Sequence, residues 1–584
     1  MKYPPFISPN EIAGGPEDQV CTRILVLPIA SPLQLYREHC IRRGLCYRFS
    51  RDQPMSFLRR ETLSAALLLA STAALAAIPA QIKTDKGTVE GESTADGKVT
   101  AFKGIPYAAP PVGNLRWAPP APAEPWTGTR SAHDFGYHCV QSVVYSDMAF
   151  HDPGASEDCL TLNVWTPADS PSAKLPVMVW IYGGGLSGGS TSERRQDGQY
   201  LAQRNVVVVS MNYRLGIFGF FTHPELAAES PHHATGNYGL MDQLAALQWV
   251  KQNIAAFGGD PNNVTIFGES AGSSSVSRHI ASPLSRGLFH HAIGESGGAV
   301  ASGRAPERTL EQREKADVSF AISSYGTSKL AELRRLPTED IIRPVMHNNP
   351  APNFGAVVDG WFLPRSVAEI YAAGEQAHVP LLAGWNADEG RGQVVSTTNK
   401  MTAEGFAAQA ATDFPGHSED FLKLYPHADD QEALQSASDL AGDRFIAYGT
   451  WKWLDAQVAT GQSPVYRYLF ALGNPGDRYH TPAVGAFHSD DIEYVFGTLD
   501  SRPEAVWRPE DRKLSNEIQT YWTNFARTGD PNGSGLPKWP KYGPTEWQTM
   551  HLDKTSAAKP DAHRPRYLFL DNAWFKPATP STQQ

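Results

Sequence analysis

Four short runs of hydrophobic residues in the middle of the chain predict buried β-strands. Residues 175–182 (LPVMVWIY) and 206–211 (VVVVSM) lack the alternation expected of a strand with one face in water. Residues 264–267 (VTIF) form a shorter run of the same kind. Residues 379–383 (VPLLA) form a fourth, and Pro380 confines it to a strand start. Strands that are apolar on both faces are typical of a sheet covered by helices on both sides.

Segments with helical spacing of hydrophobic residues lie between these runs. Residues 240–253 (LMDQLAALQWVKQN) have this spacing, and residues 271–281 can continue as a helix after the run at 264–267. Strands that alternate with helices predict the α/β class, with a largely parallel sheet and sites at the carboxyl ends of its strands. Because no obvious linker interrupts residues 81–584, we expect one large domain there with long loop excursions.

The first eighty residues have a different pattern. After Met55, two arginines precede a mostly apolar run over residues 63–77 and small residues near position 80. This is the layout of a secretory signal peptide, and the run is too short for a stable membrane anchor, which needs about 20 apolar residues. Because a signal peptide begins a chain, we expect 1–54 to be an over-extended start, 55–80 the signal peptide and the mature protein periplasmic or secreted. A structured N-terminal extension is the alternative.

Composition narrows the classes of partner. The 584 residues are 41% hydrophobic and 19% charged, as in a packed globular protein, and the net charge of −10 does not suggest a nucleic-acid binder. Only Cys139 and Cys159 follow residue 80. In an exported chain this count favours one disulfide, worth roughly 3 kcal/mol, over two unrelated buried thiols.

Three stretches have the pattern Gly-x-Ser-x-Gly, in which a serine can act as a nucleophile. They are residues 185–189, 268–272 and 294–298. The chemistry requires a strand, a sharp turn and a helix, so that the serine hydroxyl projects from the top of the sheet. Only Ser270 has a predicted strand before it and a predicted helix after it, whereas Ser296 leads into two glycines and Ser187 lies within a glycine run. Ser270 is therefore the candidate nucleophile, and a structural turn serine is the alternative.

The glycine run at residues 183–188 (GGGLSG) also fits the dinucleotide pattern Gly-x-Gly-x-x-Gly. That pattern needs a helix starting at the glycines and an acidic residue after the next strand. Here residues 190–198 are polar and loop-like, and Asn212, Tyr213 and Arg214 follow the next predicted strand. We therefore expect no cofactor, and instead backbone N–H groups that bind a developing oxyanion. No cluster of residues has convincing metal-ligand spacing, so no metal is expected either.

Several longer stretches carry a family resemblance. They include GIPYAAPPVGNLRW from Gly104, SEDCLTLNVW from Ser156, NYRLGIFGF from Asn212, FGGDPNNVTIFGESAG from Phe257 and GAFHSDDIEYVFG from Gly485. With these stretches the chain resembles the type-B carboxylesterase/lipase family, the cholinesterase-like α/β-hydrolases. The resemblance implies a central, mostly parallel twisted sheet with helices on both faces, a small-molecule ester substrate and, given the export signal, a bacterial exported carboxylesterase.

The resemblance also assigns a catalytic triad. His488 in GAFHSDD matches the family's catalytic histidine, and Glu389 in DEG matches its triad acid. Without the resemblance, Asp359, Asp388 and Asp491 are equally suitable acids. The chain order Ser270, Glu389, His488 is the one this fold uses.

The surroundings of the triad follow from the same resemblance. Gly184, Gly185 and Ala271 match the family's oxyanion hole, and Ser296 matches a serine beside the triad acid, although a plain turn residue is as good an explanation. Cys139 and Cys159 match the family's N-terminal disulfide. Candidate substrate-pocket residues, for which ordinary core packing is the alternative, are Tyr182, Leu186 and Phe487.

Together these assignments predict a serine hydrolase that cleaves carboxylic esters through an acyl-enzyme intermediate. An amidase, lactonase or lipase with the same triad is the alternative, and so is a non-catalytic binding protein on the same fold. An unperturbed imidazole titrates near ~6.5, so activity should rise through roughly pH 6–7 as the histidine loses its proton.

Overall fold

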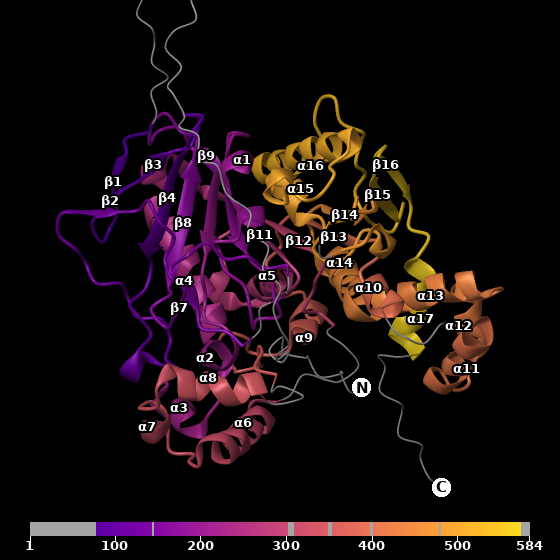
Figure 1. Cartoon of the computed structure of the whole chain (residues 1–584), viewed down its shortest axis with the longest axis horizontal. Coiled ribbons are helices and arrows are strands. Elements are labelled where there is room, and N and C mark those ends of the chain that lie inside the picture. The colour runs from indigo at the N-terminus through magenta and orange to yellow at the C-terminus, as the bar shows by residue number, and fades with distance from the viewer. Residues whose placement is uncertain are drawn as a thin grey trace, which may run out of the picture. The chain divides into compact units, whose positions relative to one another are not determined.

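Eleven strands form one sheet among the residues that the computed structural model describes (Figure 1). In spatial order they are β16 (Ala557–Pro560), β15 (Gln548–Leu552), β14 (Val465–Phe470), β13 (Leu381–Asn386), β12 (His291–Glu295), β11 (Gly259–Glu269), β9 (Leu175–Ile181), β10 (Val207–Met211), β8 (Thr161–Thr166), β4 (Thr100–Pro106) and β3 (Glu92–Ser93). Pairing is parallel from β10 to β15 and antiparallel at both edges. The expectation of a mostly parallel sheet is confirmed.

The described residues are 78–142, 145, 147–301, 309–347, 353–396, 401–477 and 480–573. The expected over-extended start at 1–54 and nearly all of the expected signal peptide at 55–80 lie outside them. Within the described ranges, no helix combines the length and apolarity that crossing a bilayer requires.

The four strands predicted from hydrophobic runs are all present, with shifted ends. Strand β10 is buried along its whole length, and β9 is buried from Val177 onward. The run at 264–267 is the buried end of β11, which begins earlier, at Gly259, with a register irregularity in between. Strand β13 begins at Leu381 rather than at residue 379, because Pro380 has no N–H to donate to a neighbouring strand.

Helices cover both faces of the sheet, as two neighbouring residues of β12 show. A Cβ added to Gly294 would meet Trp453 of α14 (Tyr448–Thr460), whereas the Glu295 carboxylate accepts a 2.7 Å hydrogen bond from Trp522 of α16 (Pro509–Thr528). Successive residues of a strand point to opposite faces, so α14 and α16 lie on opposite sides.

The remaining helices and strands complete the layers and the loop excursions. The strands are β1 (Gln81–Lys83), β2 (Thr88–Glu90), β5 (Thr129–Ser131), β6 (His138–Cys139) and β7 (Ala155–Ser156). The helices before β11 are α1 (Gln199–Ala202), α2 (Gly216–Phe220), α3 (Pro224–Glu229) and α4 (Tyr238–Asn253). Those after it are α5 (Ala271–Ala281), α6 (Leu310–Tyr325), α7 (Leu330–Leu333), α8 (Thr338–His347), α9 (Val367–Ala372), α10 (Arg391–Val395), α11 (Ala403–Asp413), α12 (Ser418–Leu424), α13 (Asp430–Gly442), α15 (Ile492–Phe496) and α17 (Arg564–Ala573).

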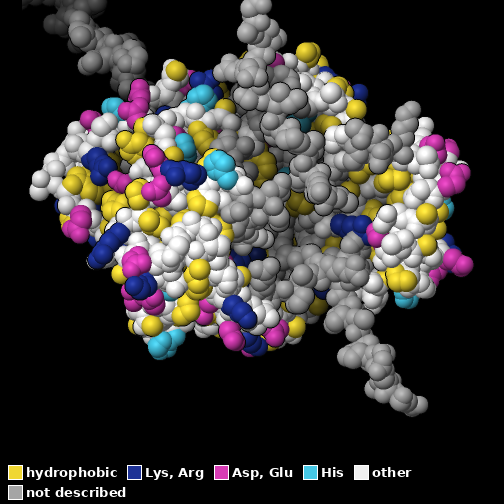
Figure 2. Space-filling model, turned by 60° about the horizontal axis from the view of Figure 1, so that its bottom comes forward, with side chains coloured by type: hydrophobic (Ala, Val, Ile, Leu, Met, Phe, Trp, Pro, Cys, Tyr) yellow, Lys and Arg dark blue, Asp and Glu magenta, His cyan; other side chains and the backbone are white. Residues whose placement is uncertain are grey.

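Two features outside the sheet bear on the sequence predictions. Cys139 and Cys159 form a disulfide, as expected, and it joins the end of β6 to the segment that leads into β8. On the face in Figure 2, acidic and basic side chains are interspersed among hydrophobic ones.

Candidate functional site

Ser270 stands at a sharp turn between β11 and α5. Its φ of 54° lies in the left-handed region, which is rare for a residue with a side chain. Such a strained backbone conformation persists only where the surrounding contacts stabilise it. Two glycines permit the turn. A Cβ at Gly272 would lie 1.9 Å from the carbonyl oxygen of Ile181, and one at Gly268 would lie 2.5 Å from the same atom. Only glycine fits at these two positions, so the strand–turn–helix predicted around Ser270 is confirmed.

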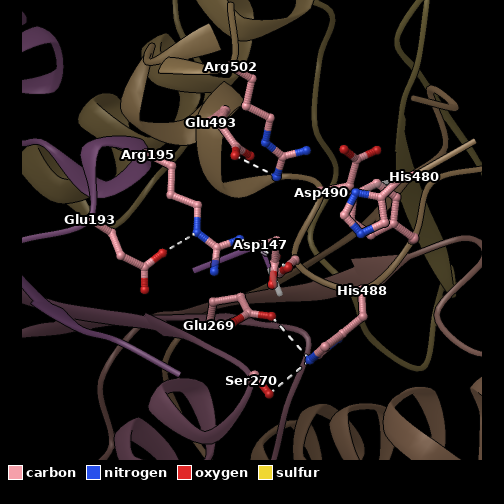
Figure 3. Close-up of polar contacts among 12 residues, drawn as sticks. Asp147, Glu193, Arg195, Glu269, Ser270, His480, His488, Asp490, Glu493 and Arg502 are labelled. Carbon is pink, nitrogen blue, oxygen red and sulfur yellow. Dashed lines mark hydrogen bonds and ion pairs between the residues drawn. The ribbon is translucent and has the colours of Figure 1, made fainter. Parts of the chain in front are cut away.

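A chain of hydrogen bonds links Ser270 to a histidine and an acid. His488 Nε2 lies 2.9 Å from Ser270 Oγ (Figure 3). On the other side of the ring, His488 Nδ1 lies 2.6 Å from Glu389 Oε2. The other carboxylate oxygen of Glu389 accepts the backbone N–H of Asn386 at 2.9 Å. The fold thus brings together three residues that are up to 218 positions apart in the sequence.

The other two motif serines have different surroundings. Ser296 also has a left-handed φ of 54°, at the end of β12, but its buried hydroxyl has no hydrogen-bond partner among the described residues. The geometry therefore gives no bond between Ser296 and the expected triad acid. The Ser187 hydroxyl donates to the carbonyl oxygen of Gly185 at 3.3 Å. Within the described part of the chain, neither serine is bonded to a histidine.

The other acids suggested by the sequence are engaged elsewhere. Asp388 accepts the backbone N–H of Ala486, and Asp359 accepts the N–H groups of Trp361 and Leu363. Asp491 accepts hydrogen bonds from Asn386 and Tyr468. Among the candidates that the sequence offers, only Glu389 is bonded to His488.

Two glycines in the loop after β9 line the same cavity as Ser270. Gly184 and Gly185 have φ values of 95° and 66°, and their N–H groups donate to no acceptor within the described part of the chain. A Cβ at Gly184 would lie 2.2 Å from the carbonyl oxygen of Gly188, so only glycine fits there. Ala271 is the first residue of α5, and a first-turn N–H has no partner within its own helix. These donors are available to a bound oxygen atom.

Glu269 is a site residue that the sequence analysis missed. Its carboxylate lies 3.3 Å from His488 Nε2, it is buried, and its Oε1 has no hydrogen-bond partner among the described residues (Figure 3). Burial raises the pKa of Glu269 to about 8. The sequence feature that could have identified Glu269 is its position directly before the candidate nucleophile, Ser270.

The two carboxylates change the expected titration of His488. Burial opposes the charged imidazolium, but the nearby charges of Glu269 and Glu389 outweigh it and raise the pKa of His488 to about 9. The expectation of a rise in activity through pH 6–7 assumed an unperturbed imidazole, and this geometry places that rise at a higher pH.

A cavity of about 450 Å³ opens beside Ser270 and His488, a volume typical of small-molecule sites. Its side-chain walls are formed by Tyr145, Asp147, Met148, Glu193, Arg195, Gln196, Gln393, Phe445, His480, Val484, Phe487, Ser489 and Ile492. Of the three candidate pocket residues, Phe487 lines the cavity. Tyr182 instead stacks on Tyr213 in the core, and Leu186 is also buried there, so these two do not form its wall.

Charged side chains brace one wall of the cavity (Figure 3). Arg195 Nε donates to Glu193 at 2.6 Å, and its Nη1 donates to Asp147 at 3.1 Å. Arg502 pairs with Glu493 at 2.6 Å in the same cluster. Asp147 belongs to the loop that the disulfide closes, so Arg195 holds that loop at the wall of the cavity that His488 also lines.

The groups at the site determine which chemistry it can perform. A hydroxyl bonded to an imidazole, which is in turn bonded to a carboxylate, can attack a carbonyl carbon while the imidazole carries the proton. Within the described ranges, no cluster of three or more His, Cys, Asp or Glu side chains is arranged to hold a metal ion.

Comparison with known proteins agrees with this chemistry. A sequence model described as the carboxylesterase family matches residues 79–569. Fumonisin B1 esterase of Sphingopyxis macrogoltabida is 37% identical over 87% of this chain and 94% of its own length. Pyrethroid hydrolase Ces2e of Rattus norvegicus is 38% identical over 78% and 82%, and cocaine esterase of Homo sapiens 36% identical over 80% and 87%. The chain therefore belongs to the carboxylesterase family of α/β-hydrolases and is a carboxylic-ester hydrolase.

Proposed function

We propose that this carboxylesterase cleaves its ester through an acyl-enzyme intermediate on Ser270. The supporting observation is the chain of hydrogen bonds from Ser270 through His488 to Glu389. The Ser270 oxygen attacks the ester carbonyl while His488 Nε2 takes the hydroxyl proton, and the imidazolium then gives that proton to the leaving alcohol oxygen. A water molecule, deprotonated by the same nitrogen, releases the acid and restores Ser270.

Glu389 holds the histidine for both steps. Its Oε2 accepts the Nδ1–H of His488, which leaves Nε2 free to take the serine proton, and its charge stabilises the imidazolium. The backbone N–H of Asn386 fixes the other oxygen. The N–H groups of Gly184, Gly185 and Ala271 would bind the oxyanion of the tetrahedral intermediate, each worth about 3 kcal/mol.

A mass measurement tests the intermediate directly. The enzyme is mixed with a p-nitrophenyl ester, quenched in acid during the first turnover and digested. We expect the acyl group on the peptide that contains Ser270, with a burst of about one p-nitrophenol per enzyme. An acyl group on another residue, or turnover with no burst and no adduct, would contradict the proposal.

The substrate is a small-molecule ester. The relatives' names include hydrolases of fumonisin B1, pyrethroids and cocaine, all of which fit the proposal of a medium-sized organic ester. An amidase, lactonase or lipase would use the same triad. A panel with one acyl group presented as ester, amide and lactone separates these activities, and we expect the ester to be cleaved fastest.

Replacing Gly184 by alanine is expected to lower kcat by about 100-fold or more. The new Cβ would meet the Gly188 oxygen at 2.2 Å and oppose the φ of 95°, so the loop must move and carry its N–H donors away from the oxyanion. The measurement is kcat on a chromogenic ester. Gly326→Ala is the matched control, because Gly326 has a φ of 74° at the end of α6 with open space around its Cβ position. An active Gly184→Ala enzyme would refute this oxyanion hole.

Replacing Glu269 by glutamine should move the acid limb of the pH–activity profile to lower pH. Activity requires neutral His488, so it is lost as the pH falls through the pKa of that residue. Removing the charge 3.3 Å from Nε2 lowers this pKa, by about one unit or more. The measurement is kcat/KM from pH 5 to 10.

Glu295→Gln is the control for that experiment. Glu295 is also a buried carboxylate, and burial raises its pKa, but it accepts its hydrogen bond from Trp522 and has no contact with His488 among the described residues. We expect the acid limb of the Glu295→Gln profile to stay at the pH of the wild type. If the acid limb of Glu269→Gln stayed at the wild-type pH or moved to higher pH, the proposed effect of Glu269 on His488 would be ruled out.

A further inference from the structure

One turn of π-helix interrupts a long helix beside the active site. Helix α13 continues through the π turn Asp443–Ala447 into α14 without a break. A π turn holds an extra residue, and such turns occur frequently at functional sites. This one is tied at its start, where Asp443 accepts a 2.7 Å hydrogen bond from Tyr425 and Arg444 pairs with Asp413 at 2.8 Å.

Phe445 differs from its neighbours in this turn. Its side chain is 48% exposed, whereas Ile446 and Ala447 are buried at 8% and 3%. The ring lies edge-to-face against His488 with its centroid 4.9 Å away, and it lines the cavity that contains Ser270. A large apolar ring left in water at the wall of a cavity gains free energy when an apolar group covers it.

The reaction decides which part of the substrate lies against this ring. The alcohol oxygen of the ester must accept its proton from His488 Nε2, so the alcohol portion lies beside the imidazole. The carbonyl oxygen lies at the N–H groups of Gly184 and Gly185, which belong to the loop after β9. Because Phe445 packs on the imidazole itself, it borders the alcohol portion rather than the oxyanion.

We propose that Phe445 is a specificity-determining residue for the alcohol portion of the substrate, and that the enzyme favours esters of ring-bearing apolar alcohols. The π turn supports this role because it presents Phe445 to the cavity while its neighbours pack inward. The inference rests on the proposed function, since it uses His488 as the residue that protonates the leaving alcohol.

The test compares three esters whose two arms are varied separately. 2-Phenylethyl acetate carries the ring on the alcohol side, ethyl 3-phenylpropanoate carries it on the acyl side, and ethyl acetate has no ring. We expect the wild-type enzyme to favour 2-phenylethyl acetate over ethyl acetate by about tenfold in kcat/KM. In Phe445→Ala this preference should disappear, while kcat/KM for the other two esters changes less than about threefold.

Three further variants make the result specific. Phe445→Tyr keeps the ring and should keep the preference, whereas Phe445→Leu removes the ring but fills much of its volume and should lose it. Tyr200→Ala is the matched control, because Tyr200 is 46% exposed on α1 and does not line the cavity. Melting temperatures show whether each variant is folded, and Phe445→Leu decides the comparison if Phe445→Ala is unstable.

Three outcomes would overturn the proposal. An equal loss on all three esters would mean that Phe445 only shields or positions His488. A loss confined to ethyl 3-phenylpropanoate would place the ring on the acyl side, and no change would remove Phe445 from substrate recognition. A separate measurement tests the proposed function. If Ser270→Ala still hydrolysed all three esters, the proposed function would fail, whatever the result for Phe445.

Discussion

Replacing Ser270 by alanine is expected to lower kcat by about 10⁴-fold or more, with little change in melting temperature. The substitution removes the attacking oxygen and leaves the oxyanion donors and the cavity, which account for the residual rate. Alanine is small enough for the partly exposed turn position of Ser270, so the effect is on chemistry rather than on folding. The measurement is steady-state kcat on the best ester of the panel, together with a thermal melt.

The two other motif serines are the controls for this experiment. Ser187→Ala and Ser296→Ala each change a serine within Gly-x-Ser-x-Gly, but neither hydroxyl is bonded to any histidine that the structure describes. We expect both variants to keep kcat within about tenfold of the wild type. If Ser270→Ala remained active while one of these two variants was inactive, the nucleophile would have to be reassigned.

Replacing Glu389 by glutamine is expected to lower kcat by about 10⁴-fold, the size of effect known for the equivalent change in a serine protease triad. Glutamine has one carbonyl oxygen, and the backbone N–H of Asn386 needs an acceptor at the Oε1 position. The amide NH₂ then faces His488 Nδ1, which must become the acceptor, so the proton moves to Nε2 and blocks proton transfer from Ser270. The variant should fold normally and bind substrate with little change in KM.

Asp359→Asn tests whether the effect is specific to the triad acid. Asp359 is also a buried acid that the sequence alone allowed, but it accepts the backbone N–H groups of Trp361 and Leu363. We expect a lower melting temperature and an unchanged kcat per folded enzyme. A large loss of kcat in Asp359→Asn and none in Glu389→Gln would exchange the two assignments.

The sequence predicted the elements that the site depends on because their physical requirements are local. A strand buried on both faces needs a run of hydrophobic residues, and the turn at Ser270 needs glycines where the chain touches Ile181. Both requirements are visible in a few consecutive letters. The resemblance then named His488 and Glu389, which no local pattern could have joined to Ser270 over the 218 residues that separate it from His488.

Features that depend on packing were beyond the sequence. Leu186 follows the glycine run, but its φ of 57° and its burial take its side chain away from the cavity. The π turn shifts the helical register, and this shift turns Phe445 toward the cavity. The hydrophobic pattern of the sequence does not reveal such a shift. The raised pKa of His488 comes from the position of Glu269, which a sequence pattern treats as an arbitrary residue between glycine and serine.

The way the site is divided between sheet and loops has an evolutionary consequence. The proposed nucleophile, the proposed oxyanion glycines and the proposed triad acid follow β11, β9 and β13, where steric contacts such as that at Gly272 restrict substitution. Much of the cavity wall comes from α10, the π turn and the disulfide-closed loop, whose exposed members include Phe445 and Tyr145. Mutations in these outer segments can therefore alter which ester is accepted at little cost to stability, while the reaction itself is inherited unchanged.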